Sequence, residues 1–427
     1  MRNVRRRLLA SVLFAGLVGA VATASLGSAG AAPAFDDGVT AKGVKIGYIF
    51  SQTGVAGSTF LHAGDGCKAR IARANAKGGV NGRKISVEYV DDQSSGANKT
   101  AAQDLVQNKH VFMVINNSSF GFLTYQWLLD NNVPLIGGGY DGTYYGAPGN
   151  EKIISASGNV VSAQGVTYDG MPKLMKKMGA TKVAALAYGV SASSTAAAVN
   201  LQKYAVPAAG LTAAYTNTTV EFGSSDVGPL VLGIKNSGAD AVYLPMVASS
   251  NIAVVQGLAQ NGVKMKSTVL ATGYGQAMLD QPVSKTFGPE VLMATGFAPV
   301  ELKTKATKQF QADLKKYAGF KGVPDYGVYT GYITCDLALV GLQNAGNPPT
   351  RANFVPNLRK LGSYDQAGLA CRPIDISTTT YGKASPISCG WYVQVKNGKF
   401  VLFPKNGKPN VGKLVAASAA TTTTAAP

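Results

Sequence analysis

Few residues in this sequence are able to perform covalent chemistry. Only two histidines are present, His62 and His110, and a Ser–His–Asp triad has to include one of them. Each lies in or beside a helical pattern, where a histidine is typically a surface residue. The motifs H-E-x-x-H, G-x-S-x-G and G-x-x-x-x-G-K-[ST] do not occur. The sequence therefore predicts a protein that is not an enzyme, and a hydrolase is the minor alternative.

Three glycines form an apparent dinucleotide-binding motif. Gly137, Gly139 and Gly142 give G-x-G-x-x-G directly after a predicted strand at 133–136. A dinucleotide fingerprint has to open a helix whose N-terminus holds the pyrophosphate. Residues 143–149 are turn-forming instead, so no nucleotide cofactor is expected. The glycines still present backbone N–H groups at the carboxyl edge of a parallel sheet, where open α/β folds bind ligands.

A second polar cluster, Asn116-Asn117-Ser118-Ser119, follows a predicted buried strand at 111–115. Ser119 suits the N-cap of a helix that begins near Gly121. Capping is compatible with ligand contact, because a helix N-terminus favours a carboxylate.

The chain begins with a pattern typical of a secretory signal peptide. Arg2 and Arg5–Arg7 precede an apolar stretch from Leu8 to about Val21, and small residues follow. A membrane anchor is the alternative, but the apolar stretch is shorter than the roughly 20 residues that span a bilayer. We therefore expect cleavage near Ala31–Ala34 and an extracytoplasmic mature protein.

The four cysteines, Cys67, Cys335, Cys371 and Cys389, all lie beyond this signal. An even number in an oxidising compartment favours two disulfides, for which three pairings exist. Cys371 and Cys389 are close in sequence and flank a turn-rich stretch, so we favour that pair, which leaves Cys67 with Cys335. A metal site is disfavoured because no C-x-x-C occurs and no histidine lies near a cysteine.

Positive charge is spread along the chain. The sequence has a formal net charge of +18, and without the four arginines of the signal it is +14. The densest group of lysines lies on one helical face at 303–316, so nucleic-acid binding is not expected, and attraction to an anionic cell envelope is the simpler use of the charge. Residues 411–427, which end in Ala/Thr low complexity, are predicted to be a disordered tail.

Strand and helix patterns alternate along the rest of the chain, which predicts parallel sheets with right-handed crossovers. The expected strands are 44–50, 84–91, 111–115, 133–136, 182–187, 211–216, 241–244, 267–271 and 291–294. The expected helices are 60–76, 98–108, 121–130, 161–178, 193–209, 227–237, 249–260, 303–317 and 325–344. Two runs of βα units of similar size predict an α/β fold with two Rossmann-like lobes.

These elements together resemble the type 1 periplasmic binding proteins, and most closely their leucine/isoleucine/valine-binding branch. The most specific stretch is ARANAKGGVNGRKISVEYVDD at 72–92. Weaker similarities are VKIGYIFSQTG at 44–54, INNSSFGF at 115–122, VPLIGGGYDG at 133–142, SGADAVYLP at 237–245 and AQNGVK at 259–264.

The resemblance implies two lobes that are joined by three crossovers and close on a ligand. The crossovers are expected near Ser155–Gly158, Ala294–Phe297 and Cys389–Tyr392. Lobe 1 is then 43–156 plus 297–390, and lobe 2 is 157–296 plus 391–410. The implied function is capture of a small organic solute and its delivery to the permease subunits of an ABC importer, and the alternative is a ligand-sensing module for signalling.

The resemblance also implies the ligand site, as the family holds an amino acid's carboxylate on a serine pair and on the loop after the fourth strand. The matching positions are Ser118, Ser119, Gly138, Gly139 and Tyr140. The first-strand loop adds Ser51, Gln52 and Ser58. In lobe 2, the family's aromatic position falls at Ser191–Ser193, so Ser191 and Ser193 stand there without a ring and Tyr188 is a substitute.

One departure from the family pattern affects the ligand. The acid that pairs an amino acid's ammonium group aligns near Gly273-Tyr274, where no acid stands. Because a buried ammonium without a partner is costly, we expect an aromatic or branched carboxylate or amide as ligand. Aromatic residues are expected to line the pocket: Tyr140, Tyr144, Phe120, Phe122 and Tyr274.

Overall fold

A computed structural model of the chain describes residues 35–416, except residues 141, 143, 158–164, 225, 379–384 and 386. The predicted signal peptide (1–34) and residues 417–427 of the predicted tail lie outside the described residues. The described residues form one compact unit.

The first sheet has five parallel strands in the order β2-β1-β3-β4-β5. Their bounds are β1 Gly43–Phe50, β2 Lys84–Asp91, β3 Val114–Asn117, β4 Leu135–Gly137 and β5 Ile153–Ser155. Helices cover both faces, so its central strands are apolar on both sides.

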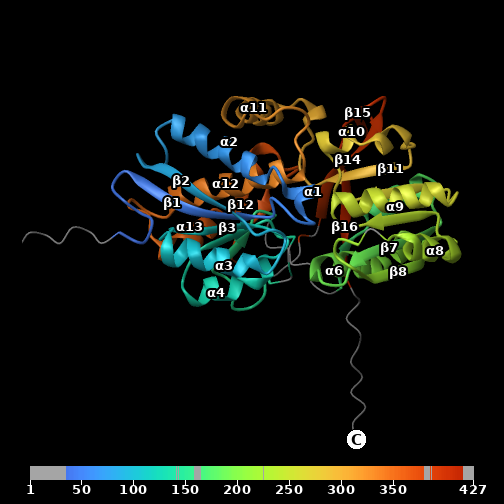
Figure 1. The fold of residues 1–427 in the computed structure, drawn as a ribbon, viewed down its shortest axis with the longest axis horizontal. Coiled ribbons are helices and arrows are strands. Elements are labelled where there is room, and N and C mark those ends of the chain that lie inside the picture. Colours follow the sequence, from blue (N-terminus) through green and yellow to red (C-terminus); the bar gives the residue numbers. More distant parts are fainter. Residues whose placement is uncertain are drawn as a thin grey trace, which may run out of the picture. The chain divides into compact units, whose positions relative to one another are not determined.

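The two faces of β1 belong to different parts of the core. Ile46, Tyr48 and Phe50 pack in the cluster that includes α2 (Ala63–Ala76) and α12 (Tyr326–Asn344). Ile49 points the other way, because side chains alternate along a strand, and it packs with residues of α3 (Ala97–Gln103) and α4 (Tyr125–Asp130). Figure 1 shows α2 beside one face of this sheet, with α3 and α4 beside the other.

The second sheet has parallel strands at its centre and antiparallel strands at one side. The order is β6-β16-β14-β11-β10-β9-β7-β8, with β15 also paired to β14. Parallel strands are β7 Lys182–Tyr188, β8 Thr212–Val220, β9 Ala241–Leu244, β10 Ser267–Leu270 and β11 Val291–Thr295. Antiparallel strands are β6 Val166–Tyr168, β14 Ile387–Lys396, β15 Lys399–Phe403 and β16 Asn410–Ala416.

The remaining elements are mostly helices that pack on these sheets, with α8 and α9 beside the second sheet (Figure 1). Their bounds are α1 Gly57–Phe60, α5 Gly170–Lys177, α6 Ala192–Asn200, α7 Val206–Ala208, α8 Gly228–Ser237, α9 Ala248–Gln260, α10 Gln276–Asp280, α11 Lys305–Asp313 and α13 Arg351–Lys360. A small hairpin of β12 Ser363–Tyr364 and β13 Ile374–Asp375 completes the fold. Among the described residues, no helix is both long and apolar enough to cross a membrane.

The chain passes between the two sheets after β5, after β11 and before β14. The first passage includes residues outside the described part. The other two lie side by side, because Thr295 at the end of β11 pairs with Trp391 in β14. The lobe boundaries 43–156 plus 297–390 and 157–296 plus 391–410 stay a prediction.

Four sequence expectations are wrong. Ser119 does not cap the helix predicted at 121–130, because that segment begins as a 3-10 helix with Phe120 at its N-cap and no side-chain cap. The helix predicted at 161–178 is strand β6 followed by the shorter helix α5, because β6 pairs with β16 at the sheet edge. The helix predicted at 60–76 is interrupted between α1 and α2. The tail predicted from 411 begins later, because residues 411–416 belong to β16, which pairs with β14 and β6.

Two disulfides join the four cysteines in the favoured pairing, Cys67 with Cys335 and Cys371 with Cys389. The first connects α2 to α12, and glycines let these two helices approach closely. A Cβ atom on Gly331 would stand 1.9 Å from the backbone oxygen of Ala63, and one on Gly66 would stand 2.0 Å from that of Val328. The Cys67–Cys335 disulfide therefore joins two helices whose close packing already depends on glycines in the sequence.

Removing the two disulfides is expected to have unequal effects on stability. The Cys67–Cys335 bond closes a sequence separation of 268 residues and the Cys371–Cys389 bond one of 18. Chain entropy then predicts a loss of about 5 kcal/mol of unfolding free energy for Cys67→Ala/Cys335→Ala and about 3 kcal/mol for Cys371→Ala/Cys389→Ala. Urea unfolding of both variants measures this. A larger loss for the short loop would contradict the expectation.

Candidate functional site

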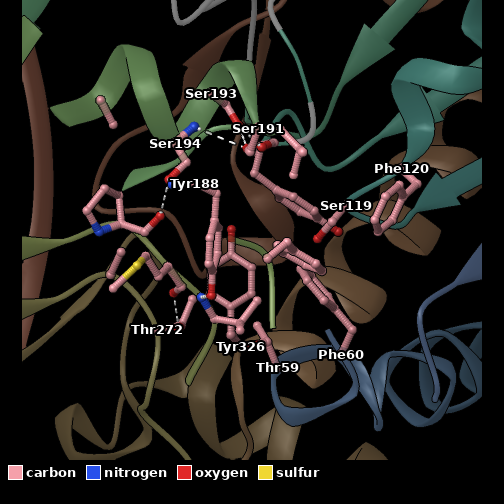
Figure 2. Close-up of a pocket in the computed structure, with 18 of the residues that line it drawn as sticks. Thr59, Phe60, Ser119, Phe120, Tyr188, Ser191, Ser193, Ser194, Thr272 and Tyr326 are labelled. Carbon is pink, nitrogen blue, oxygen red and sulfur yellow. Dashed lines mark hydrogen bonds between the residues drawn. The ribbon is translucent and has the colours of Figure 1, made fainter. Parts of the chain in front are cut away.

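A cavity of about 280 Å³ opens where the carboxyl ends of strands from both sheets meet (Figure 2). Most of its lining follows the end of a strand: Ser119, Phe120 and Phe122 after β3; Gly139 and Tyr140 after β4; Val190, Ser191, Ser193, Ser194 and Ala197 after β7; Phe222 after β8; Pro245, Met246 and Val247 after β9; and Ala271 and Thr272 after β10. Tyr188 and Tyr243, within β7 and β9, also line it, as do Thr59, Phe60 and Tyr326 from α1 and α12. This is the sheet edge at which open α/β folds bind ligands.

A buried polar network fixes the loop after β3. Ser118 donates a hydrogen bond from Oγ to the carboxylate of Asp92, and its Oγ lies 3.1 Å from that of Ser51. Asp92 also accepts from Asn98, at 2.9 Å. All of these side chains are buried. The hydroxyls of Ser51 and Ser118 are therefore committed to the protein itself, and they hold the backbone that carries Ser119.

Tyr140 forms a wall of the cavity through its ring. Its hydroxyl donates to Oδ1 of Asn117 at 2.5 Å. The ring stacks on Phe60, with centroids 5.0 Å apart, and meets Tyr326 edge-on at 5.7 Å. The hydrogen bond to the side-chain amide of Asn117 therefore fixes the position of the Tyr140 ring.

The opposite wall comes from β7 and the start of α6. Ser191 is the N-cap of α6, and its Oγ accepts from the backbone N–H of Ser194. Ser193 donates from Oγ to the backbone oxygen of Tyr140, which links the two walls. Tyr188 donates to Oγ of Ser250 at 2.7 Å and accepts from the backbone N–H of Val247 at 3.3 Å.

One serine of the lining differs from the other serines in its hydroxyl. Ser119 lies half-buried at the cavity (Figure 2). Within the described part of the chain no hydrogen bond involves its side chain, whereas Ser191, Ser193 and Ser194 all have protein partners. Ser119 can therefore donate to, or accept from, a bound molecule without breaking an existing bond.

Among the described residues, the lining carries no Asp, Glu, Lys, Arg or His. Its titratable groups there are tyrosines, and burial raises the pKa of Tyr188, although its hydrogen bonds with Ser250 and Val247 oppose that rise. Burial also raises the pKa of Tyr243 to about 12. Both phenols are neutral at physiological pH, so the described part of the lining is uncharged and rich in aromatic rings. No group of side chains in the described residues is arranged to hold a metal ion.

The residues predicted from sequence fall into three places. Ser119, Gly139, Tyr140, Tyr188, Ser191 and Ser193 line the cavity. Ser51 and Ser118 lie beneath the cavity and bond to the protein. The backbone oxygen of Gly138 accepts a hydrogen bond from Ser157. Gln52 is exposed, and its backbone N–H donates to the carboxylate of Asp91. Ser58 and Tyr274 line a second cavity.

Several lining residues were not predicted from the sequence. Phe222 and the segment Pro245–Val247 follow strand ends, and this position could have identified them. Thr59, Phe60 and Tyr326 gave no such signal, because they belong to helices that only the tertiary fold brings here.

The comparisons with known proteins agree with this architecture. A sequence profile described as periplasmic binding protein matches residues 43–399. Among curated protein sequences, none matches significantly.

Solved structures match at low identity. The branched-chain amino acid transporter substrate-binding protein LivJ from Streptococcus pneumoniae, in complex with isoleucine, has a TM-score of 0.69 at 17% identity, covering 84% of this chain and 98% of its own. A benzoate complex of a solute-binding protein from R. palustris has 0.68 at 16%, covering 88% and 98%. A fatty acid transporter substrate-binding protein from Thermomonospora curvata has 0.69 at 19%, covering 90% and 95%. At these identities the similarity shows the fold.

Two tyrosines of the lining are expected to differ in their effect on stability. Tyr188→Phe leaves the buried N–H of Val247 and the hydroxyl of Ser250 without their partner, which costs about 1–3 kcal/mol of unfolding free energy. Tyr243→Phe removes a hydroxyl for which the described residues provide no hydrogen bond, so it is expected to change stability by less than about 0.5 kcal/mol. Chemical denaturation of the two variants measures the difference, and equal losses would contradict it.

Proposed function

Because the chain belongs to the periplasmic binding protein family, we propose that it captures a small organic solute outside the cytoplasm and delivers it to the permease subunits of an ABC importer. The proposed ligand site is the cavity between the two sheets, formed by Ser119, Gly139, Tyr140, Tyr188, Ser191 and Ser193. The protein acts by binding and needs no catalytic group. The predicted signal peptide and the family membership support an extracytoplasmic location, and the positive charge favours attraction to an anionic envelope.

The observation that carries the proposal is the uncharged aromatic lining around the open hydroxyl of Ser119. An amino acid that enters this cavity brings a carboxylate and an ammonium group, and a buried charge is costly unless it is paired. A carboxylate alone is served by hydroxyl and backbone N–H donors, whereas an ammonium group finds no anion among the described residues of the lining. The favoured ligand is therefore an aromatic or branched carboxylate, or an amide. Solved neighbours in complex with benzoate, 4-hydroxybenzoate and isoleucine show which solutes this fold accommodates in other proteins.

Capture by closure is supported by contacts between the two proposed lobes. Ser193 bonds the backbone oxygen of Tyr140, and the backbone N–H of Ala248 donates to Oγ1 of Thr59 at 3.0 Å. Oγ of Ser58 donates to that of Ser249 at 3.2 Å. These neutral hydrogen bonds each contribute only about 1 kcal/mol. Tyr274 and Gln276 add further hydrogen bonds between the proposed lobes, to Glu301 and Val323. A ligand that touches both walls adds to the closing free energy.

A ligand screen tests the class of solute. In a thermal-shift screen of the mature protein, aromatic or branched carboxylates and amides are expected to raise the unfolding temperature, because a ligand that binds only the folded state stabilises it by mass action. Leucine and valine are expected to raise it less, since the described lining offers their ammonium group no anionic partner. Strong stabilisation by leucine or valine would contradict this proposal.

Two substitutions test the location of the site, using the best stabiliser from the screen. Ser119→Ala is expected to weaken binding roughly tenfold through the loss of one hydrogen bond to a charged group, and Tyr140→Ala is expected to weaken it more through the loss of ring contact. Ser363→Ala, on the exposed side of β12, is the matched control. Isothermal titration measures affinity and circular dichroism confirms folding. Unchanged affinity in both variants would exclude this cavity.

A further inference from the structure

A second cavity, of about 310 Å³, lies next to the first. The two share Thr59 and Tyr326 in their linings. The second is completed by Ser58, Ala248, Ser249, Ile252, Gly273, Tyr274, Gly275, Ala277, Met278, Gln281 and Asp325. Unlike the first cavity, it has a carboxylate in its wall, Asp325, and its lining has no Lys, Arg or His.

The position of Asp325 is fixed by the backbone around it. Asp325 is the N-cap of α12, and Oδ1 accepts from the backbone N–H of Val328 at 2.9 Å. The loop between β10 and α10 packs directly against it, because a Cβ atom on Gly275 would stand 2.5 Å from the Cβ atom of Asp325. Gly275 has a φ of 145°, which also favours glycine. The loop residues Gly273-Tyr274, which carry no acid, therefore face a carboxylate that a distant helix supplies.

The carboxylate lacks a close cation. No Lys, Arg or His nitrogen of the described residues lies within ion-pair distance of Asp325, whereas His62, the nearest charged influence, is bonded to Asp65 at 3.0 Å. Burial raises the pKa of Asp325 to about 6, while the backbone N–H groups of Val328 and Gly327 and the charge of His62 lower it and Asp65 raises it. Glu301, also near this wall, bonds the hydroxyl of Tyr274. A cation that binds next to a desolvated carboxylate without a counter-ion gains more electrostatic free energy than one that binds next to a solvated or paired carboxylate.

We infer that the second cavity binds the protonated amino group of a small organic amine, with Asp325 as its counter-ion. Ser58 and Ser249 offer hydroxyl oxygens near the entrance, and Ile252 and Met278 give the hydrocarbon part an apolar surface. This site adjoins the proposed solute site, with which it shares Thr59 and Tyr326, and it takes the opposite charge.

The test compares an amine with its matched alcohol in the mature protein. Isothermal titration at pH 7.5 with phenethylamine and 2-phenylethanol is expected to show the amine binding at least roughly tenfold tighter, as a charge-assisted hydrogen bond provides. Asp325→Asn keeps a side-chain acceptor for the N-cap but removes the charge, and it is expected to abolish the preference. Asp169→Asn, at the start of α5 and outside both cavities, is the matched control and keeps the preference.

The pH dependence gives a second readout. The carboxylate of Asp325 is ionised above its raised pKa of about 6 and neutral below it, so the preference of the wild type for the amine is expected to shrink between pH 7.5 and pH 5. Asp325→Asn is expected to unfold at no lower temperature than the wild type at pH 7.5, because it removes a desolvated charge. This confirms that lost binding is not lost folding.

Three results would overturn the inference: no preference for the amine in the wild type, a preference that persists in Asp325→Asn, or loss of amine binding in Ser119→Ala. The last would place the amine in the first cavity. Failure of the proposed solute function gives a different result. In that case no carboxylate or amide in the thermal-shift screen stabilises the protein, while the preference for the amine over the alcohol remains.

Discussion

Parallel strand pairing is the constraint on which the site depends. Neighbouring parallel strands end at the same edge of a sheet, so the loops after β3 and β4 are brought together on one side and those after β7, β9 and β10 on the other. No single loop forms the cavity. The chain needs only short polar or glycine-rich segments at these strand ends, and the two sheets place them.

The two cavities differ in how the protein handles charge. Beneath the first, Asp92 is buried but receives hydrogen bonds from Ser118 and Asn98, so its charge is used to hold the loop and stays out of the cavity. In the second, Asp325 accepts from the backbone N–H of Val328 and lines the cavity, and no Lys, Arg or His of the described residues forms an ion pair with it. A carboxylate with several donors is structural, because its lone pairs are satisfied. One whose pKa is raised by burial retains interaction free energy for a ligand.

The sequence predicted most of the fold because most elements carry strong local patterns. Strands such as β2 and β9 were predicted with their observed bounds, since their apolar residues alternate or run together between turn residues. Strand β5 has only three residues, and β16 stands next to low-complexity sequence, so both depend on pairing partners far along the chain. The same reason limits the site: residues after strand ends were predictable, whereas Asp325 and Tyr326 reach their cavities only through the packing of α12.

The passages between the sheets limit how the two proposed lobes can move. Thr295 pairs with Trp391, and a Cβ atom on Gly390 would stand 2.8 Å from the backbone oxygen of Thr295. Two of the three passages thus form one paired ribbon, and the Cys371–Cys389 disulfide ties its second strand to the segment before it. Breaking ladder hydrogen bonds costs more than bending the ribbon, so we expect the proposed closure to be a bend about this ribbon. Such a bend would change the distance between Ser193 and Tyr140, whose hydrogen bond links the two walls of the cavity.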